Sequence, residues 1–297
     1  LKVTLTGSLP PGVFAKDIAL YLIGMISAEG ADYLSVEIHG DGVNTLSIDD
    51  RMTIANLASE MGAKNCVFPP DEVLREYLGK SAPYSAENHG DSRTNRTTAN
   101  EAYAGSGNDP FGIWADQEAY YLKEINLDLG SLFPVVSAPH QVDNVKAVDE
   151  VAGIPIQQAL IGTCTNGRQS DLQIAASLLK GKKVAPGVQL LVIPASKEIY
   201  LDAIRTGIAE IFLQAGASIL TPSCGPCLGT GQGIPADGTT VISTANRNFL
   251  GRMGNKNASI YLASRPQSSC RPSKEKSPPR PRSSSQPSTD KSPPRSR

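Results

Sequence analysis

Apolar and polar positions change period several times in the first half of the chain. The opening segment, residues 1–7 (LKVTLTG), alternates apolar and polar side chains, which is typical of a β-strand with one buried face. Helical spacing follows, and one such segment is introduced by Ser47 and Asp50, a pair typical of a helix N-cap. The expected elements are strands at 1–7, 32–39 and 65–68, and helices at 18–26, at 50–63 and from residue 70 onward.

From about residue 150 the sequence repeats short apolar strands and amphipathic helices. Strands that are apolar along their whole length indicate a parallel sheet with helices on both faces. We therefore predict an α/β fold of two three-layer αβα modules with mainly parallel sheets, residues 1–145 and 146–264. Ligands bind such sheets beyond the carboxyl ends of the strands, so the loops after QALIG, ASILT and TTVIST are expected to meet at one site. The predicted elements are strands at 158–162, 188–193, 217–221 and 239–244 and helices at 170–181, 196–207 and 209–216.

Two stretches lack a sustained period. Residues 85–115 are polar and rich in Asn, Ser, Thr and Gly, and we interpret them as an exposed loop or insertion in the first module. Beyond Ser264 the composition turns to Ser, Pro, Lys and Arg, with eight of the 22 prolines in residues 265–297. This tail has too few apolar residues for a core and is predicted to be disordered.

Composition narrows the class of protein. With 297 residues, 40% of them hydrophobic, the chain is long enough for a packed core and one to two domains. No apolar stretch approaches the roughly 18 residues of a membrane-spanning helix and no basic-then-apolar leader opens the chain, so we expect a cytoplasmic protein without a membrane partner. The tail holds nine Lys or Arg against two acids, which leaves 19 bases and 27 acids in residues 1–264. That acidic body argues against nucleic-acid binding and leaves only the basic tail as a candidate contact.

Five cysteines, an odd number, do not resemble a secreted disulfide framework. Cys164 follows the strand QALIG, and Cys224 and Cys227 form a Cys-X-X-Cys pair after ASILT. Three thiolates at neighbouring strand ends are enough to hold three corners of a [4Fe–4S] cluster while one iron stays open. The same spacing fits a thioredoxin-like redox couple, half of a zinc site or structural thiols. Zinc lacks an evident fourth ligand, because none of the three histidines lies near a cysteine in the sequence.

Longer ordered motifs surround these cysteines and recur upstream. They are IGTCTNGRQSDLQIAASLLKGKKV (161–184), PSCGPCLG (222–229), STANRNFLGRMG (243–254), LTGSLPPGVFAKDI (5–18) and SIDDRMTIANLASEMGAKNCVFPPDE (47–72). These segments resemble the aconitase superfamily, in particular the large subunits of 3-isopropylmalate dehydratase and homoaconitase. The match covers residues 1–264 apart from the polar stretch at 85–115. The resemblance implies a [4Fe–4S] cluster on Cys164, Cys224 and Cys227, whose open iron binds the hydroxyl and carboxylate of the substrate.

The resemblance implies a hydro-lyase that isomerises a hydroxy di- or tricarboxylate by dehydration and rehydration, with 2-isopropylmalate to 3-isopropylmalate as the leading case. This chemistry needs a Lewis acid at the leaving hydroxyl, cations that hold carboxylates, and a base. Arg247 and Arg252 follow the strand TTVIST and could each grip a carboxylate through a bidentate fork. Without the family context, arginines at strand ends are as often solvated or paired with protein carboxylates.

Four further polar residues belong to the implied site. Asn56 and Glu60 lie four residues apart on one predicted helix, share a face, and are the catalytic candidates, with Glu60 handling the hydroxyl or water. By resemblance, Asn166 and Asn246 lie beside the cluster. Taken alone, a helical glutamate is more often a solvated surface residue.

Two departures from the family pattern bear on activity. Family large subunits carry a further domain before the segment that begins here at Leu1, and that domain contributes to the active site. The serine base for the α-proton belongs to a swivelling small subunit. We therefore expect a fragment that partners with the small subunit and is catalytically incomplete alone. The alternative is a remnant or a non-catalytic metal- or thiol-binding module.

The tail also departs from the family, which continues from LAS into PAT where this chain reads RPQSSCRPSKEKS (265–277). With permitted codons, one extra base after the Ser264 codon turns the same bases into SPATVVVPAFEGKV. We therefore interpret residues 265–297 as an out-of-frame tail in which Cys270 has no function. The alternative is a genuine Pro/Ser/Arg interaction tail.

Overall fold

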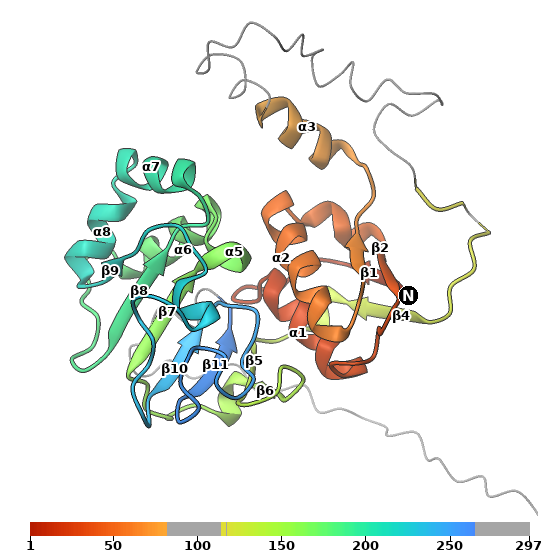
Figure 1. The fold of residues 1–297 in the computed structure, drawn as a ribbon. Helices are drawn as coiled ribbons and strands as arrows, with labels where there is room; N and C mark the ends of the chain where they lie inside the picture. The colour runs from red at the N-terminus through yellow and green to blue at the C-terminus, as the bar shows by residue number, and fades with distance from the viewer. Residues whose placement is uncertain (82–113, 117, 265–297) are drawn as a thin grey trace, which may run out of the picture.

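The computed structural model of the chain describes residues 1–81, 114–116 and 118–264 (Figure 1). Nearly all of the predicted polar insertion and the whole predicted tail lie outside these residues. Within them the chain forms one sheet of four strands and one of seven, and most strand pairs are parallel. The predicted α/β class with mainly parallel sheets is therefore confirmed. Among the described residues, no helix combines the length and the hydropathy of a membrane-spanning segment.

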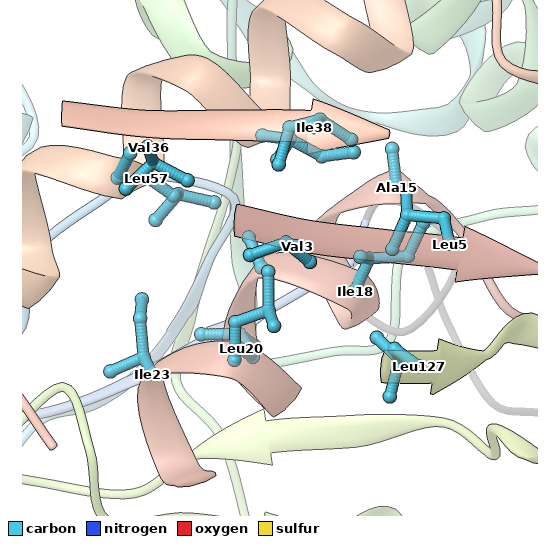
Figure 2. Close-up of a cluster of buried hydrophobic side chains, with 14 of the residues drawn as sticks. Val3, Leu5, Ala15, Ile18, Leu20, Ile23, Val36, Ile38, Leu57 and Leu127 are labelled. Atoms are coloured by element: carbon cyan, nitrogen blue, oxygen red, sulfur yellow. The ribbon is translucent and has the colours of Figure 1, made fainter. Parts of the chain in front are cut away.

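The four-stranded sheet belongs to the first half of the chain. Its strands lie in the order β3-β2-β1-β4, and every neighbouring pair is parallel. Val3, Leu5, Val36 and Ile38 alternate with less buried residues and point into one core (Figure 2). The elements are β1 (Lys2–Thr6), α1 (Ala15–Ile26), β2 (Ser35–His39), α2 (Ile48–Ala58), β3 (Asn65–Val67), α3 (Glu72–Ser81) and β4 (Glu124–Asp128).

Helices cover one face of this sheet in the described part of the chain. Ile18 of α1 and Leu57 of α2 join the same core as the strands. The opposite face carries polar, partly exposed residues such as Glu37, which accepts a hydrogen bond from the Tyr121 hydroxyl at 2.6 Å. The described residues thus form two layers here where three were predicted, because strands that alternate apolar and polar side chains bury only one face.

Helix α2 ends earlier than predicted, at Ala58. The next residues, Ser59–Met61, tighten into a 3-10 turn, and Gly62 closes the turn in the left-handed conformation with φ 85°. Glu60 therefore lies on this turn and not on the helix that carries Asn56.

The seven-stranded sheet contains the strands predicted after residue 150 and three more. Its order is β6-β5-β11-β10-β7-β8-β9, in which β5 and β6 are antiparallel additions to a parallel sheet. The elements are β5 (Val135–Ser137), β6 (Val145–Ala147), β7 (Gln158–Gly162), α5 (Thr163–Asn166), α6 (Gln169–Leu179), β8 (Gln189–Ile193), α7 (Lys197–Arg205), α8 (Ile208–Ala215), β9 (Ser218–Ile219), β10 (Thr240–Ser243) and β11 (Ser259–Ala263).

Strand β5 joins the second sheet although it precedes residue 145, the predicted end of the first module. It pairs with β11, with Ser137 opposite Leu262. The strand pairing thus places the change of sheet before Val135.

Two cores lie on the two faces of the second sheet. On one face, Ile161 of β7 packs with Leu172 of α6 and Phe212 of α8. On the other, Leu160 packs with Cys227, a residue of the predicted site. Helices therefore cover one face, and the loops beyond the strand ends help to cover the other.

Candidate functional site

Three loops at the carboxyl ends of parallel strands carry the predicted site residues. Cys164 lies in α5, directly after β7. Cys224 and Cys227 lie in the loop after β9, where a 3-10 helix spans Gly225–Leu228. Asn246 follows β10, and its Oδ1 lies 3.9 Å from the Sγ of Cys227. The loops after β9 and β10 thus meet at one edge of the sheet, as predicted.

The turn that presents Cys164 depends on Gly162. This glycine has φ 125°, and a Cβ atom on it would collide with the carbonyl oxygen of Ile193 on β8. Thr163 follows with φ 66°, which is uncommon for a β-branched residue. The chain therefore leaves the sheet sharply, so that Thr163 is buried and Cys164 is exposed.

Side-chain amides connect the loop after β7 to the other two. The Nδ2 of Asn56, on α2, donates to the Sγ of Cys164 at 3.8 Å, and the Thr165 hydroxyl donates to the Oδ1 of Asn56 at 3.2 Å. The Nδ2 of Asn246 donates to the same Oδ1 at 3.3 Å, and the Cys227 thiol donates to the Oδ1 of Asn246. Two thiols from separate loops are therefore linked through two amides. One amide belongs to the region of the four-stranded sheet and its helices, and the other to the region of the seven-stranded sheet; these are the two sheet regions of the chain.

The three cysteines are free thiols, of which Cys164 and Cys224 are exposed and Cys227 is buried. Burial raises the pKa of the Cys227 thiol, and the guanidinium of Arg252 opposes that rise. Within the ranges that the structure describes, no three His, Cys, Asp or Glu side chains converge as ligands of a single metal ion must. A [4Fe–4S] cluster makes a different demand, because three separate irons each bind one thiolate. Three thiols that form no disulfide, with amides beside Cys164 and Cys227, fit such a cluster.

Glu60 and Arg247 form an ion pair between the two sheet regions. The Nε of Arg247 donates to the Oε1 of Glu60 at 2.6 Å, and the Glu60 side chain is 9% exposed. Burial raises the pKa of Glu60, while Arg247, Ser59 and Arg252 oppose the rise. This carboxyl is thus easier to protonate than an exposed glutamate, which suits a residue that holds or releases a proton.

Arg252 lies at the same edge and is close enough to lower the pKa values of Cys227 and Glu60. Its guanidinium carbon lies 5.5 Å from the centre of the Phe249 ring. Its Nε is buried and has no hydrogen-bond partner among the described residues. An unpaired buried donor is costly, so this N–H is a candidate contact for an anionic ligand.

Asn166 is buried at the same strand end, but its hydrogen bonds do not go to a cysteine. Its Nδ2 donates to the Oδ1 of Asp171 at 3.1 Å and to the Thr53 hydroxyl at 3.4 Å. In this structure Asn166 therefore joins α5 to the start of α6 and to α2. Its place beside a cluster stays a prediction.

Two charged residues that the sequence patterns do not single out, Lys16 and Asp17 of α1, are 1% and 0% exposed. The Nζ of Lys16 donates to the carbonyl oxygens of Thr244 and Ala245, immediately before Asn246. A signal was present in the sequence, because a Lys-Asp pair interrupts an otherwise apolar helix (AKDIALYL), and such charges are rarely buried unless paired.

Several curated proteins are similar to this chain over most of its length. It is 48% identical over 263 residues to the 3-isopropylmalate dehydratase large subunit 2 of Archaeoglobus fulgidus and 45% identical over 264 residues to the 3-isopropylmalate dehydratase large subunit of Clostridium kluyveri. It is 46% identical over 265 residues to the probable methanogen homoaconitase large subunit of Methanosarcina mazei. Each alignment covers 89% of this chain but only 58%, 57% and 60% of the respective relative, so the chain spans less than two thirds of their length.

A solved structure, the holo form of Thermococcus kodakaraensis aconitase X, aligns with 83% of this chain and 48% of its own length, with 14% identity and a TM-score of 0.42. A sequence model of the aconitase family (aconitate hydratase) matches residues 1–153 and 144–268, which include both sheets. From this family match, we conclude that the chain belongs to the aconitase family.

Proposed function

We propose that this chain is the cluster- and carboxylate-binding part of a hydro-lyase that isomerises a hydroxy di- or tricarboxylate by dehydration and rehydration. The observation that carries the proposal is the linked set Cys164, Asn56, Asn246 and Cys227, with Arg247 beside it at the same sheet edge. Two of the three relatives described above are named 3-isopropylmalate dehydratase, so the proposed substrate is 2-isopropylmalate and the product 3-isopropylmalate.

Cys164, Cys224 and Cys227 are the residues that would hold a [4Fe–4S] cluster. When bound, such a cluster supplies a Lewis acid for the hydroxyl of the substrate. Asn56 already donates to the sulfur of Cys164, and hydrogen bonds to cluster sulfurs adjust the reduction potential. We therefore assign Asn56 and Asn246 to the surroundings of the cluster.

The two arginines are the proposed anchors of the substrate carboxylates. Arg252 offers a buried Nε that has no partner in the described part of the chain. Arg247 gives one N–H to Glu60, and a guanidinium has five, so donors remain for a carboxylate. Glu60, whose pKa is raised by burial, holds or accepts a proton next to that carboxylate.

The relatives are named large subunits, and we propose that this chain also works with a small subunit. The small subunit would supply the base that removes the α-proton, while Glu60 of this chain, whose pKa is raised by burial, would handle the hydroxyl or water. Turnover is therefore assigned to the assembly, which includes the parts of the relatives that this chain does not span.

Anaerobic reconstitution of the chain with iron and sulfide tests the proposal. We expect a broad visible absorption band and, after mild oxidation, the EPR signal of a three-iron cluster, both absent in Cys227→Ser. The matched control is Cys66→Ser, which removes a thiol of β3 whose pKa burial raises to about 12. Both signals should survive in the control. A chain that is folded but stays colourless would contradict the proposal and favour a zinc- or thiol-binding module.

A further inference from the structure

Lys16 is a buried cation in an unfavourable place. Its side chain is 1% exposed, although lysine is almost never buried without a partner. It is the second residue of α1, and the positive end of the helix dipole disfavours a cation there. Compensating contacts must therefore hold this ammonium group.

Those contacts come from the other sheet region. The Nζ of Lys16 lies 2.5 Å from the carbonyl oxygens of both Thr244 and Ala245. These two residues directly follow Ser243, the last residue of β10. The next two residues are Asn246 and Arg247, which contact Asn56 and Glu60. The ammonium group thus binds the segment that presents both side chains.

The neighbouring Asp17 fastens the same helix start to two more strands of the second sheet. Its Oδ1 accepts a hydrogen bond from the Val135 amide of β5 at 3.0 Å. Its Oδ2 accepts from the Ser264 hydroxyl, directly after β11, at 2.6 Å. One charged pair at the start of α1 therefore reaches three strands of the sheet that carries the cysteines.

Four groups from different elements interact electrostatically with the Lys16 ammonium: Cys227 after β9, Asp17 on α1, Asp171 on α6 and Cys164 after β7. Burial lowers the pKa of Lys16 to about 7, and these four groups oppose the change because each favours the charged form. Two of the four are proposed cluster ligands. A thiolate-bound cluster places negative charge at this position, and a buried cation nearby offsets it.

We propose that Lys16 is a positioning residue of the cluster site: it fixes the segment 244–247 through two carbonyl oxygens and provides the positive charge that offsets the thiolates of Cys164 and Cys227. This inference rests on the proposed function, because it assumes that the thiols bind an iron–sulfur cluster.

The variant Lys16→Met tests the inference, since methionine keeps an unbranched apolar side chain and removes the charge and the donors. The matched control is Lys183→Met: the Nζ of Lys183 also donates to a backbone carbonyl, that of Gln214, but this lysine is exposed. Each chain is reconstituted anaerobically with iron and sulfide, and iron content, EPR spectrum and reduction potential are measured.

We expect Lys16→Met to bind several-fold less iron, to show a changed EPR spectrum, and to have a lower reduction potential, because loss of a nearby cation disfavours the added electron. Lys183→Met should match the wild type in all three. Equal iron content, spectrum and potential in Lys16→Met and wild type would overturn the inference. If the wild type itself binds no cluster, the proposed function fails first, so the two failures are distinguishable.

Circular dichroism and thermal unfolding report whether Lys16→Met folds. If it does not, Lys16→Gln separates the two parts of the role, because its amide can still donate to the carbonyls but carries no charge. We expect Lys16→Gln to keep part of the iron and still show the lowered potential.

NMR of the wild-type chain with lysines labelled at ¹³Cε gives a test that needs no variant. Among the described residues Lys16 is the buried lysine, so its signal is recognised by its protection from a soluble relaxation agent. Its signal should broaden or shift when the cluster is bound. A protected lysine signal that does not change on loading would overturn the inference.

Discussion

The two sheet regions contribute to the site in different ways. In the seven-stranded sheet, β7 is buried throughout. The loops that follow β7, β9 and β10 carry the three thiols and both arginines. In the four-stranded sheet the strands alternate, and the region reaches the site through Asn56 of α2, Glu60 after it and Lys16 of α1. In the proposed function, the strand ends of the seven-stranded sheet supply the thiols and the arginines, while α1, α2 and the turn after α2 bring Lys16, Asn56 and Glu60 to them.

The largest effect is expected from Cys224→Ser, in the second region. Cys224 is exposed and lies three residues before Cys227, so as a ligand it binds a separate iron. We expect its replacement to abolish the visible band of the reconstituted chain as completely as Cys227→Ser does. A cluster of undiminished iron content in Cys224→Ser would show that this thiol is not a ligand.

Gly162→Ala should be the next most damaging change. The added Cβ would meet the carbonyl oxygen of Ile193 at φ 125°, and we expect a loss of about 3 kcal/mol or more of unfolding free energy. The control Gly181→Ala has φ 73° and open space around the new Cβ, so only about 1 kcal/mol should be lost. Denaturant unfolding measures both, and equal losses would contradict a tight approach of β7 to β8.

Glu60→Gln probes the contact between the two regions through pH. The folded-state pKa of Glu60 lies above its ordinary value of 4.5, so between these two values the folded chain binds more protons than the unfolded chain. The contribution of Glu60 to stability is therefore fully present below pH 4.5 and is lost as pH rises through the folded pKa. The stability of the wild type relative to Glu60→Gln should fall over that range. A difference that stays flat or rises with pH would contradict the burial of this carboxyl.

The smallest effects are expected from the helix caps. The Ser47 hydroxyl accepts a hydrogen bond from the Asp50 amide at 3.2 Å, which confirms the predicted N-cap of α2, and the Ser196 hydroxyl accepts one from Ile199 at the start of α7. Ser47→Ala and Ser196→Ala should each cost about 1 kcal/mol and speed amide hydrogen exchange only in the first turn of their own helix. Exchange that also accelerates around Asn56 would show that the cap of α2 controls the site.

The strand ends of the second region were predictable because they follow from local patterns. Apolar runs such as QALIG mark buried strands, and in a parallel sheet the residues after them, Cys164 among them, must lie at one edge. The short strand β11 was not predicted. It has only five residues, it ends just before the composition changes after Ser264, and no helical pattern lies between it and β10 to mark a strand–helix–strand unit.

Contacts between the two regions were less predictable. The helical period predicts Asn56 and Glu60 on one helix face, but α2 ends at Ala58, and Glu60 lies on the 3-10 turn that Gly62 closes. The partners of Lys16 lie 228 and 229 residues away along the chain, so no local pattern could name them. Arg247, the partner of Glu60, lies 187 residues away along the chain, so this contact was not predictable from a local pattern either.

Mössbauer spectroscopy of the chain reconstituted with ⁵⁷Fe and sulfide tests the three-thiol cluster most directly. Three thiolates and one open corner predict four irons and four sulfides per chain, with one iron in an environment distinct from the other three. Addition of 2-isopropylmalate should shift the signal of that one iron and leave the others in place. A single iron without sulfide, or four equivalent irons that do not respond to the carboxylate, would contradict a cluster held by Cys164, Cys224 and Cys227.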